Sequence, residues 1–131
     1  MNTTTVHIPV SIGELLDKIV ILEIKAERIS DQAKLINIKN ELQSLRSIRP
    51  EALIHNPSVA PWEQSLREAN AKLWDLEDRI RDKERQDNYD QEFIEIARLI
   101  YRTNDHRAQA KKMINVLCGS EIVEEKSYRP Y

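Results

Sequence analysis

The chain has 131 residues, of which 20 are basic and 22 acidic, so its formal net charge is −2. This length suits one domain that can fold unaided, and the interleaved charges lack the basic stripe expected for sequence-independent nucleic-acid binding. Two glycines are too few for an all-β domain, and a single cysteine excludes an intrachain disulfide framework. No apolar run approaches the roughly 18 residues of a membrane span. Strong helix formers dominate the composition, which predicts an all-α protein.

Residues 1–10 are predicted to form an extended arm. Val6, Ile8 and Val10 alternate with polar residues, as in a strand with one apolar face. Pro9 would restrict such a strand to the edge of a sheet. The opening residues, MNTTTVHIPVS, lack the basic start and the apolar core of a signal peptide. The sequence therefore indicates a cytoplasmic protein.

Residues 11–48 are predicted to form a helical hairpin or one kinked helix. Ser11 and Glu14 have the spacing of a capping box at the start of a helix. Two apolar stripes follow, and their phase changes at Ser30 and Asp31. We expect a break there, with Ser30 capping a second helix; the alternative is one long helix whose buried face rotates. The stripes are Leu15, Ile19, Leu22, Ala26 and Ile29, and then Leu35, Ile38, Leu42 and Leu45.

A loop is predicted at residues 49–60 and a third helix at residues 61–86. Pro50, Asn56 and Pro57 punctuate the loop, and Pro61 suits a first helical turn. Asn88 and Gln91 have the spacing of another capping box, which would open the last helical segment, residues 89–118. The seam of the third helix comprises Trp62, Leu66, Ala69, Leu73, Leu76 and Ile80.

The last helical segment has apolar ends and a polar middle, YRTNDHRAQAK. If the helix is continuous, Asn104, Arg107 and Lys111 face the bundle or its edge. Because an isolated buried charge is very costly, Arg107 would then need a carboxylate partner or a bound anion. The candidate carboxylates are Asp17, Glu23 and Glu27. Alternatively, Thr103 or Asn104 caps a new helix after a break, and the polar run is a simple turn.

The fold class that these segments predict is an antiparallel bundle of about four helical segments. Gly119 is a suitable helix stop, and residues 119–131 form a tail. An even number of antiparallel helices leaves both chain ends at the same end of the bundle. We therefore expect the short extended terminal segments VHIPV and EIVEEKSY to pair as a small ribbon.

The polar run supplies the candidate ligand-binding site: Tyr101, Asn104, Asp105, Arg107 and Lys111, with Arg28 from the first helix. The structural alternative is an internal Arg–carboxylate pair that fixes helix register. No catalytic residues are assigned, and His7, His55 and His106 lack metal-ligand spacing. We expect neither a metal site nor a cofactor. Cys118, near a helix C-terminus, is predicted to be a small buried residue.

Several segments of the chain resemble an uncharacterised bacterial family of small helical proteins and domains, a domain of unknown function. They are SIGELLDKIVILEIKAERI, LWDLEDRIR, YRTNDHRAQAK and GSEIVEEKSY. The resemblance implies a helical fold and a bacterial or phage origin, and it implies no activity. The segment LLDKIVILEIKAERI, with Arg28 near its end, also has a rhythm similar to the first helix of the all-helical chorismate mutases. Those enzymes hold a dicarboxylate with inward Arg and Lys.

Two functions are weighed from the sequence. The first is a non-enzymatic, self-associating helical interaction module, because the seams are long and no catalytic constellation occurs. The alternative is a small anion-binding or enzymatic protein with a cationic site around Arg107 and Lys111. The expected partner is thus a second copy, another protein or a small anionic ligand, and neither a membrane nor nucleic acid. The two functions differ in whether Arg107 and Lys111 line a concavity or are satisfied by internal carboxylates.

Overall fold

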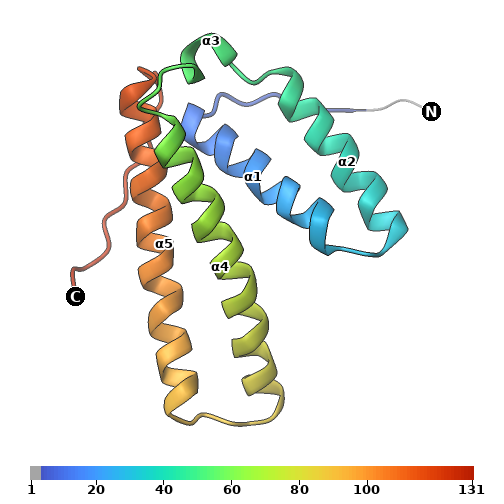
Figure 1. Cartoon of the computed structure of the whole chain (residues 1–131), viewed down its shortest axis with the longest axis vertical. Helices are drawn as coiled ribbons and strands as arrows, with labels where there is room; N and C mark the ends of the chain where they lie inside the picture. Colours follow the sequence, from blue (N-terminus) through green and yellow to red (C-terminus); the bar gives the residue numbers. More distant parts are fainter. Residues whose placement is uncertain (1–3) are drawn as a thin grey trace.

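The computed structural model describes residues 4–131, and the first three residues of the predicted arm lie outside this description. Within residues 4–131 the fold is all-α, with five helices and no strand, so the predicted fold class is confirmed (Figure 1). None of these helices is long and apolar enough to cross a membrane. The helices are α1 (Ile12–Arg28), α2 (Gln32–Ser47), α3 (Glu51–Ile54), α4 (Ala60–Arg85) and α5 (Gln91–Leu117).

The helices form two hairpins, α1–α2 and α4–α5, which join along α1 (Figure 1). Helix α1 packs against α2, α4 and α5, and the longer α4–α5 hairpin continues beyond it. A helix between two layers must be apolar on two faces. The face of α1 toward α2 carries Leu15, Ile19 and Leu22, which pack on Ile38 and Leu42.

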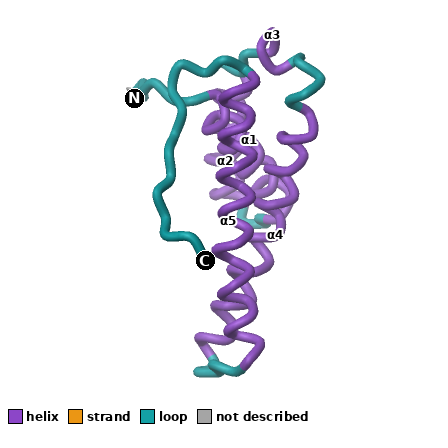
Figure 2. The backbone as a smooth tube through the Cα atoms, turned by 90° about the vertical axis from the view of Figure 1, so that its left-hand side faces the viewer, coloured by secondary structure: helices purple, strands orange, loops and turns teal. Residues whose placement is uncertain are grey.

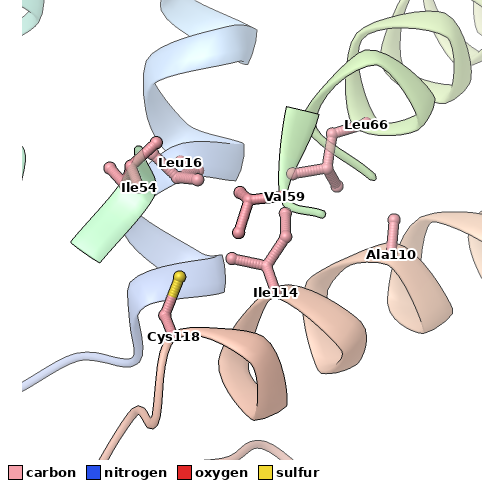
Figure 3. Packing of buried hydrophobic residues seen from close by; sticks show 7 residues of the cluster. All are labelled: Leu16, Ile54, Val59, Leu66, Ala110, Ile114 and Cys118. Atoms are coloured by element: carbon pink, nitrogen blue, oxygen red, sulfur yellow. The ribbon is translucent and has the colours of Figure 1, made fainter. Parts of the chain in front are cut away.

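The second apolar face of α1 joins the other hairpin. Leu16 belongs to a buried cluster with Leu66 of α4, with Ala110 and Ile114 of α5, and with Cys118 (Figure 3). The 49–60 segment contributes Ile54 and Val59 to the same cluster. That segment was predicted to be a plain loop, but it contains the four-residue helix α3. The side chains of Ile54 and Val59 cover this end of the core.

The predicted break between the first two helices is confirmed, because α1 ends at Arg28 and α2 begins at Gln32. The prediction that Ser30 caps α2 is wrong: the cap is Asp31, which accepts a hydrogen bond from the Lys34 amide at 3.2 Å. The side chain of Asp31 lies next to the first helical residue, where a capping oxygen reaches the third amide. Ser30 is one position too early to do so.

The first and last helices also begin at capped residues. Ser11 accepts from the Glu14 amide as predicted, at 3.1 Å, but the Glu14 carboxylate contacts Lys111 instead of closing the capping box. The predicted box of Asn88 and Gln91 is wrong, because α5 begins at Gln91 itself. Asp90 is the cap and accepts from the amide of Phe93.

Helix α5 is continuous from Gln91 to Leu117, so the TNDHR run lies inside a helix and not at a turn. This result decides between the two interpretations of the polar run in favour of the continuous helix. After α5, Gly119 adopts φ +63°, which glycine reaches without steric cost, and the chain reverses direction. The tail then runs back beside α5 (Figure 2).

The predicted terminal ribbon is wrong. Residues 4–10 and 121–131 are extended without strand pairing in the described chain. The reason is that the tail's side chains are engaged elsewhere: Glu124 and Glu125 bind lysines of α5, at 3.2 and 2.9 Å. We call residues 119–131 the strap, because they cross the surface of α5 and are held at several points.

Candidate functional site

A buried carboxylate joins three helices at the centre of the molecule. The Asp17 side chain, on α1, is 1% exposed. Arg107 of α5 donates to it from Nε, at 3.0 Å to Oδ1, and from Nη2, at 2.5 Å to Oδ2. Asn70 of α4 donates from Nδ2 to Oδ1 at 2.8 Å. The hydrogen bonds with Asp17 raise the pKa of Arg107, so the guanidinium stays charged.

Lys111 lies one helical turn further along α5 and contacts carboxylates on both sides. Its Nζ donates to Glu14 of α1 at 2.6 Å and to Glu124 of the strap at 3.2 Å. Asp17 is 3.9 Å away. Burial lowers the pKa of Lys111, but hydrogen bonds with Glu14 and Glu124 and the nearby Asp17 outweigh burial and leave the pKa raised. The lysine is therefore a cation at neutral pH.

The start of α1 is fixed to the end of α5 by backbone amides. The Gly13 amide donates to Oδ1 of the buried Asn115 at 2.6 Å, and the Ile12 amide donates to Ser120 Oγ at 3.2 Å. A Cβ on Gly13 would lie 2.5 Å from the Lys111 carbonyl oxygen. Glycine therefore permits the close approach that brings Glu14 and Asp17 to α5.

The strap is attached to α5 at both ends of its course. Near the C-terminal end of α5, Lys112 binds Glu125 at 2.9 Å, while Glu124 binds both Lys111 and Lys126. These two lysines lower the pKa of Glu124.

At the other end of the strap, Tyr131 Oη donates to Asp105 at 2.7 Å. The Tyr131 ring meets Tyr101 edge to face at 5.0 Å. Arg102 lies 5.9 Å from the Tyr131 ring centre. The strap is therefore clipped to α5 by an aromatic contact as well as by ion pairs.

Between the strap and α5 lies a cavity of about 600 Å³. Five of the six predicted site residues line it: Tyr101, Asn104, Asp105, Arg107 and Lys111. Arg28 does not belong to this lining; it pairs with Asp75 at 2.6 Å and lies over Trp74. The structure therefore brings the polar run of α5 together and leaves Arg28 apart from it.

The strap and the end of α5 add further charged and aromatic residues to the lining. Lys112, Lys126 and Arg129 join Arg107 and Lys111, so five cations face two carboxylates, Asp105 and Glu124. Tyr128 and Tyr131 join Tyr101 as aromatic lining residues. Among the lining residues, cations thus outnumber carboxylates, whereas the chain as a whole has a net charge of −2.

Two functional neighbours were not found by sequence reasoning. Asn70 and Asn115 are both buried polar residues, and each binds an atom of α1. The only available signal was an asparagine beside the apolar positions of a helix, such as Asn70 next to Ala69. That signal does not reveal the partner.

Other polar features are less organised. A second cavity, of about 320 Å³, lies between α4 and α5 and is lined by His106 and Thr103 among others. Within residues 4–131, no three His, Cys, Asp or Glu residues are grouped to hold a metal ion. Cys118 is buried as predicted, and burial raises the pKa of its thiol.

Fold and site together define a small all-α protein with a cationic cavity beneath its C-terminal strap. The chain belongs to the family of unknown function DUF6165, whose sequence profile matches residues 6–130. The resemblance to an uncharacterised family is thereby confirmed. Searches of curated proteins and of solved structures each found no match.

Proposed function

We propose that this protein binds a small anionic ligand in the cavity between α5 and the strap. The observation that supports the proposal most directly is the cationic lining of a cavity of about 600 Å³, a size typical of small-molecule sites. In an acidic chain, cations gathered around one concavity favour negatively charged solutes. This proposal takes up the alternative that the sequence left open.

The carboxylates around the cavity fall into two groups. Asp17 and Glu14 belong to α1, where they hold Arg107 and Lys111 from behind. Glu124 and Glu125 belong to the strap, which has no regular structure. Only the second group can move away without unpacking a helix. An anion would therefore enter by replacing Glu124 and Glu125 on Lys111, Lys112 and Lys126.

Two features favour Lys126 and Arg129 as first contacts for the ligand. The Lys126 side chain is 47% exposed, and its ion pair is with Glu124 of the same strap. None of the ion pairs within residues 4–131 involves Arg129. Both cations can thus turn toward a ligand without loss of a contact between helices. Arg107, by contrast, has two nitrogens committed to Asp17.

The cavity is better suited to binding than to catalysis. Among residues 4–131, no Ser, Thr or Cys lines the cavity to serve as an activated nucleophile, and no His lines it to serve as a general base. Asp105 is the acidic residue of the helix in that lining, and it accepts a hydrogen bond from Tyr131. We therefore propose a sensor or carrier of a small anion.

The test is a thermal-shift measurement with inorganic pyrophosphate, citrate and neutral sugars on the wild-type chain. A ligand that binds only the folded state raises the melting temperature. We expect pyrophosphate to raise it by a few degrees, and Lys126→Ala to remove most of that rise. Lys39→Ala, which removes an exposed lysine of α2, is the matched control and should respond like the wild type. Equal shifts in both variants would contradict the proposal.

A self-associating interaction module is the second candidate, supported by apolar side chains left in solvent. Val6 and Ile8 on the N-terminal arm are 84% and 68% exposed, and Ile36 of α2 is 62% exposed. Exposed apolar residues mark a partner surface where they form one contiguous patch. Sedimentation velocity over a wide concentration range tests this candidate. A chain that stays monomeric throughout would rule out self-association, and a dimer lost in the double variant Val6→Ser and Ile8→Ser would support it.

A further inference from the structure

The cavity beneath the strap has two chemically different ends. Five of the nine residues that α5 contributes follow the three-four spacing of a single helix face: Tyr101, Asn104, Ala108, Lys111 and Asn115. The aromatic contact between Tyr101 and Tyr131 lies at one end of this row. Lys111 and Lys112, with Lys126 opposite, lie toward the other.

The distance between these two ends limits the size of the ligand. Tyr101 and Lys111 are ten residues apart in a continuous helix, and a rise of 1.5 Å per residue places them roughly 15 Å apart along its axis. A single aromatic acid, whose carboxylate lies close to its ring, cannot contact both ends. A ligand with a flat ring, a polar spacer and an anionic chain can.

Polar side chains lie between the two ends of the cavity. Asn104 and Asp105 lie between the aromatic and the cationic end. An amide and a carboxylate are suitable partners for hydroxyl groups, because the carboxylate accepts and the amide both donates and accepts. The order along α5 is therefore aromatic, hydroxyl-binding and anion-binding.

We propose, on the basis of the anion-binding function above, that the ligand is a free nucleoside diphosphate or triphosphate. Its base stacks at Tyr101 and Tyr131, and its ribose hydroxyls face Asn104 and Asp105. Its phosphates bind Lys111, Lys112 and Lys126, where they replace the strap carboxylates Glu124 and Glu125. Stacking on aromatic rings tolerates any base, so this geometry selects nucleoside phosphates as a class.

The experiment compares ADP, inorganic pyrophosphate and adenosine by isothermal titration calorimetry with the full chain. We expect ADP to bind about tenfold more tightly than pyrophosphate, the order that one base–aromatic stack supplies. Tyr101→Ala should bind ADP no more tightly than pyrophosphate, with both ligands measured on that same variant. Tyr101→Phe, which keeps the ring, should bind ADP like the wild type. The Tyr101 side chain is 41% exposed, so neither change should prevent folding.

The outcomes separate this inference from the anion-binding function on which it rests. Equal affinities for ADP and pyrophosphate would overturn the nucleotide and retain the anion site. Absence of binding by either compound would overturn both. A short single-stranded oligonucleotide is the fourth ligand. If it binds more tightly than ADP, the proposal of a free nucleotide ligand is overturned in favour of a nucleic acid.

Discussion

Arg107 is both the partner of a buried charge and a lining residue of the cavity. Its contact with Asp17 is bidentate, and Asn70 completes the hydrogen bonding of that carboxylate. A buried carboxylate without a cation is strongly destabilising. At this residue, the internal pair that the sequence analysis considered is present, and the same side chain also lines the cavity.

Replacement of Arg107 by alanine should reduce the free energy of unfolding by about 3 kcal/mol, the lower end of the range for broken buried pairs. The lower end applies because the Arg107 side chain is 29% exposed, which admits some solvent. Urea denaturation monitored by circular dichroism measures the loss. In the double variant Asp17→Leu and Arg107→Met, apolar residues replace the pair, and part of the stability should return; the rest stays lost because Asn70 then has no acceptor. A single variant within 0.5 kcal/mol of the wild type, a difference usual at the surface, would contradict a buried pair.

Gly13 is expected to be intolerant of any side chain. Alanine would improve the helix propensity of this position by up to about 1 kcal/mol, but its Cβ would lie 2.5 Å from the Lys111 carbonyl. The clash is with backbone, which can move only if α1 and α5 separate. We therefore expect Gly13→Ala to lower stability by about 1–3 kcal/mol, measured by the same urea denaturation. Greater stability in this variant would contradict the close approach of α1 to α5 at Gly13.

At the residue scale, helical periodicity predicted that Asn104, Arg107 and Lys111 share one face of α5, and all three line the same cavity. It also named Asp17 among the partners of Arg107, which the structure confirms. Asn115 was missed, since an asparagine that binds a glycine amide of another helix has no local pattern.

The elements agree with the sequence wherever apolar periodicity is long. Helix α4 was predicted at residues 61–86 and spans Ala60–Arg85, and α5 was predicted at 89–118 and spans Gln91–Leu117. The four-residue helix α3 and the caps of α2 and α5 were missed. The two caps depend on single hydrogen bonds, such as that from Phe93 to Asp90, and several nearby polar residues could supply these equally well.

The strap should detach in acid, because Lys126 and Lys111 lower the pKa of Glu124 below its ordinary value of 4.5. A group with a depressed folded pKa adds stability above its unfolded pKa and loses it as the pH falls through the folded value. The strap should therefore stay closed from neutral pH down to about 4.5 and open below it. NMR resonances of residues 121–131, followed from pH 7 to 3, measure this opening.

Glu124→Gln is the control for the acid opening. Without the carboxylate, the same resonances should already be closer to their open positions at neutral pH, and the acid transition should shrink. If the strap resonances of the wild type move as much between pH 7 and 5 as they do below 4.5, Glu124 is not the group that holds the strap.

The arrangement of the whole molecule was the hardest feature to predict. The sequence showed one seam on α1, through Leu15, Ile19 and Leu22, which suits packing on α2. The second face begins with Leu16 and joins the α4–α5 hairpin. Because the two apolar stripes of α1 overlap, the sequence alone does not distinguish them from one broad apolar face. Which hairpin covers which stripe depends on contacts between residues about fifty to a hundred positions apart, such as Asn70–Asp17 and Gly13–Asn115.

The strap could not be placed from sequence for a related physical reason. Its residues are polar and its attachment is through ion pairs, which have no periodicity that a sequence would display. The ribbon between the chain ends was predicted because an even number of antiparallel helices leaves both ends at the same end of the bundle. In the structure, Glu124 and Glu125 instead form ion pairs with Lys111 and Lys112, and these ion pairs hold the strap over the cavity.

The central claim is that an anionic ligand replaces the strap carboxylates on the lysines of the cavity. The most direct test is to titrate pyrophosphate into the wild type and into Glu124→Gln. The substitution removes the negative charge shared by Lys111 and Lys126 while keeping the size of the side chain. The account predicts that Glu124→Gln binds pyrophosphate several-fold more tightly than the wild type, as measured by isothermal titration calorimetry. Unchanged or weaker binding, or no binding by either chain, would contradict it and leave the ion pairs with a purely structural role.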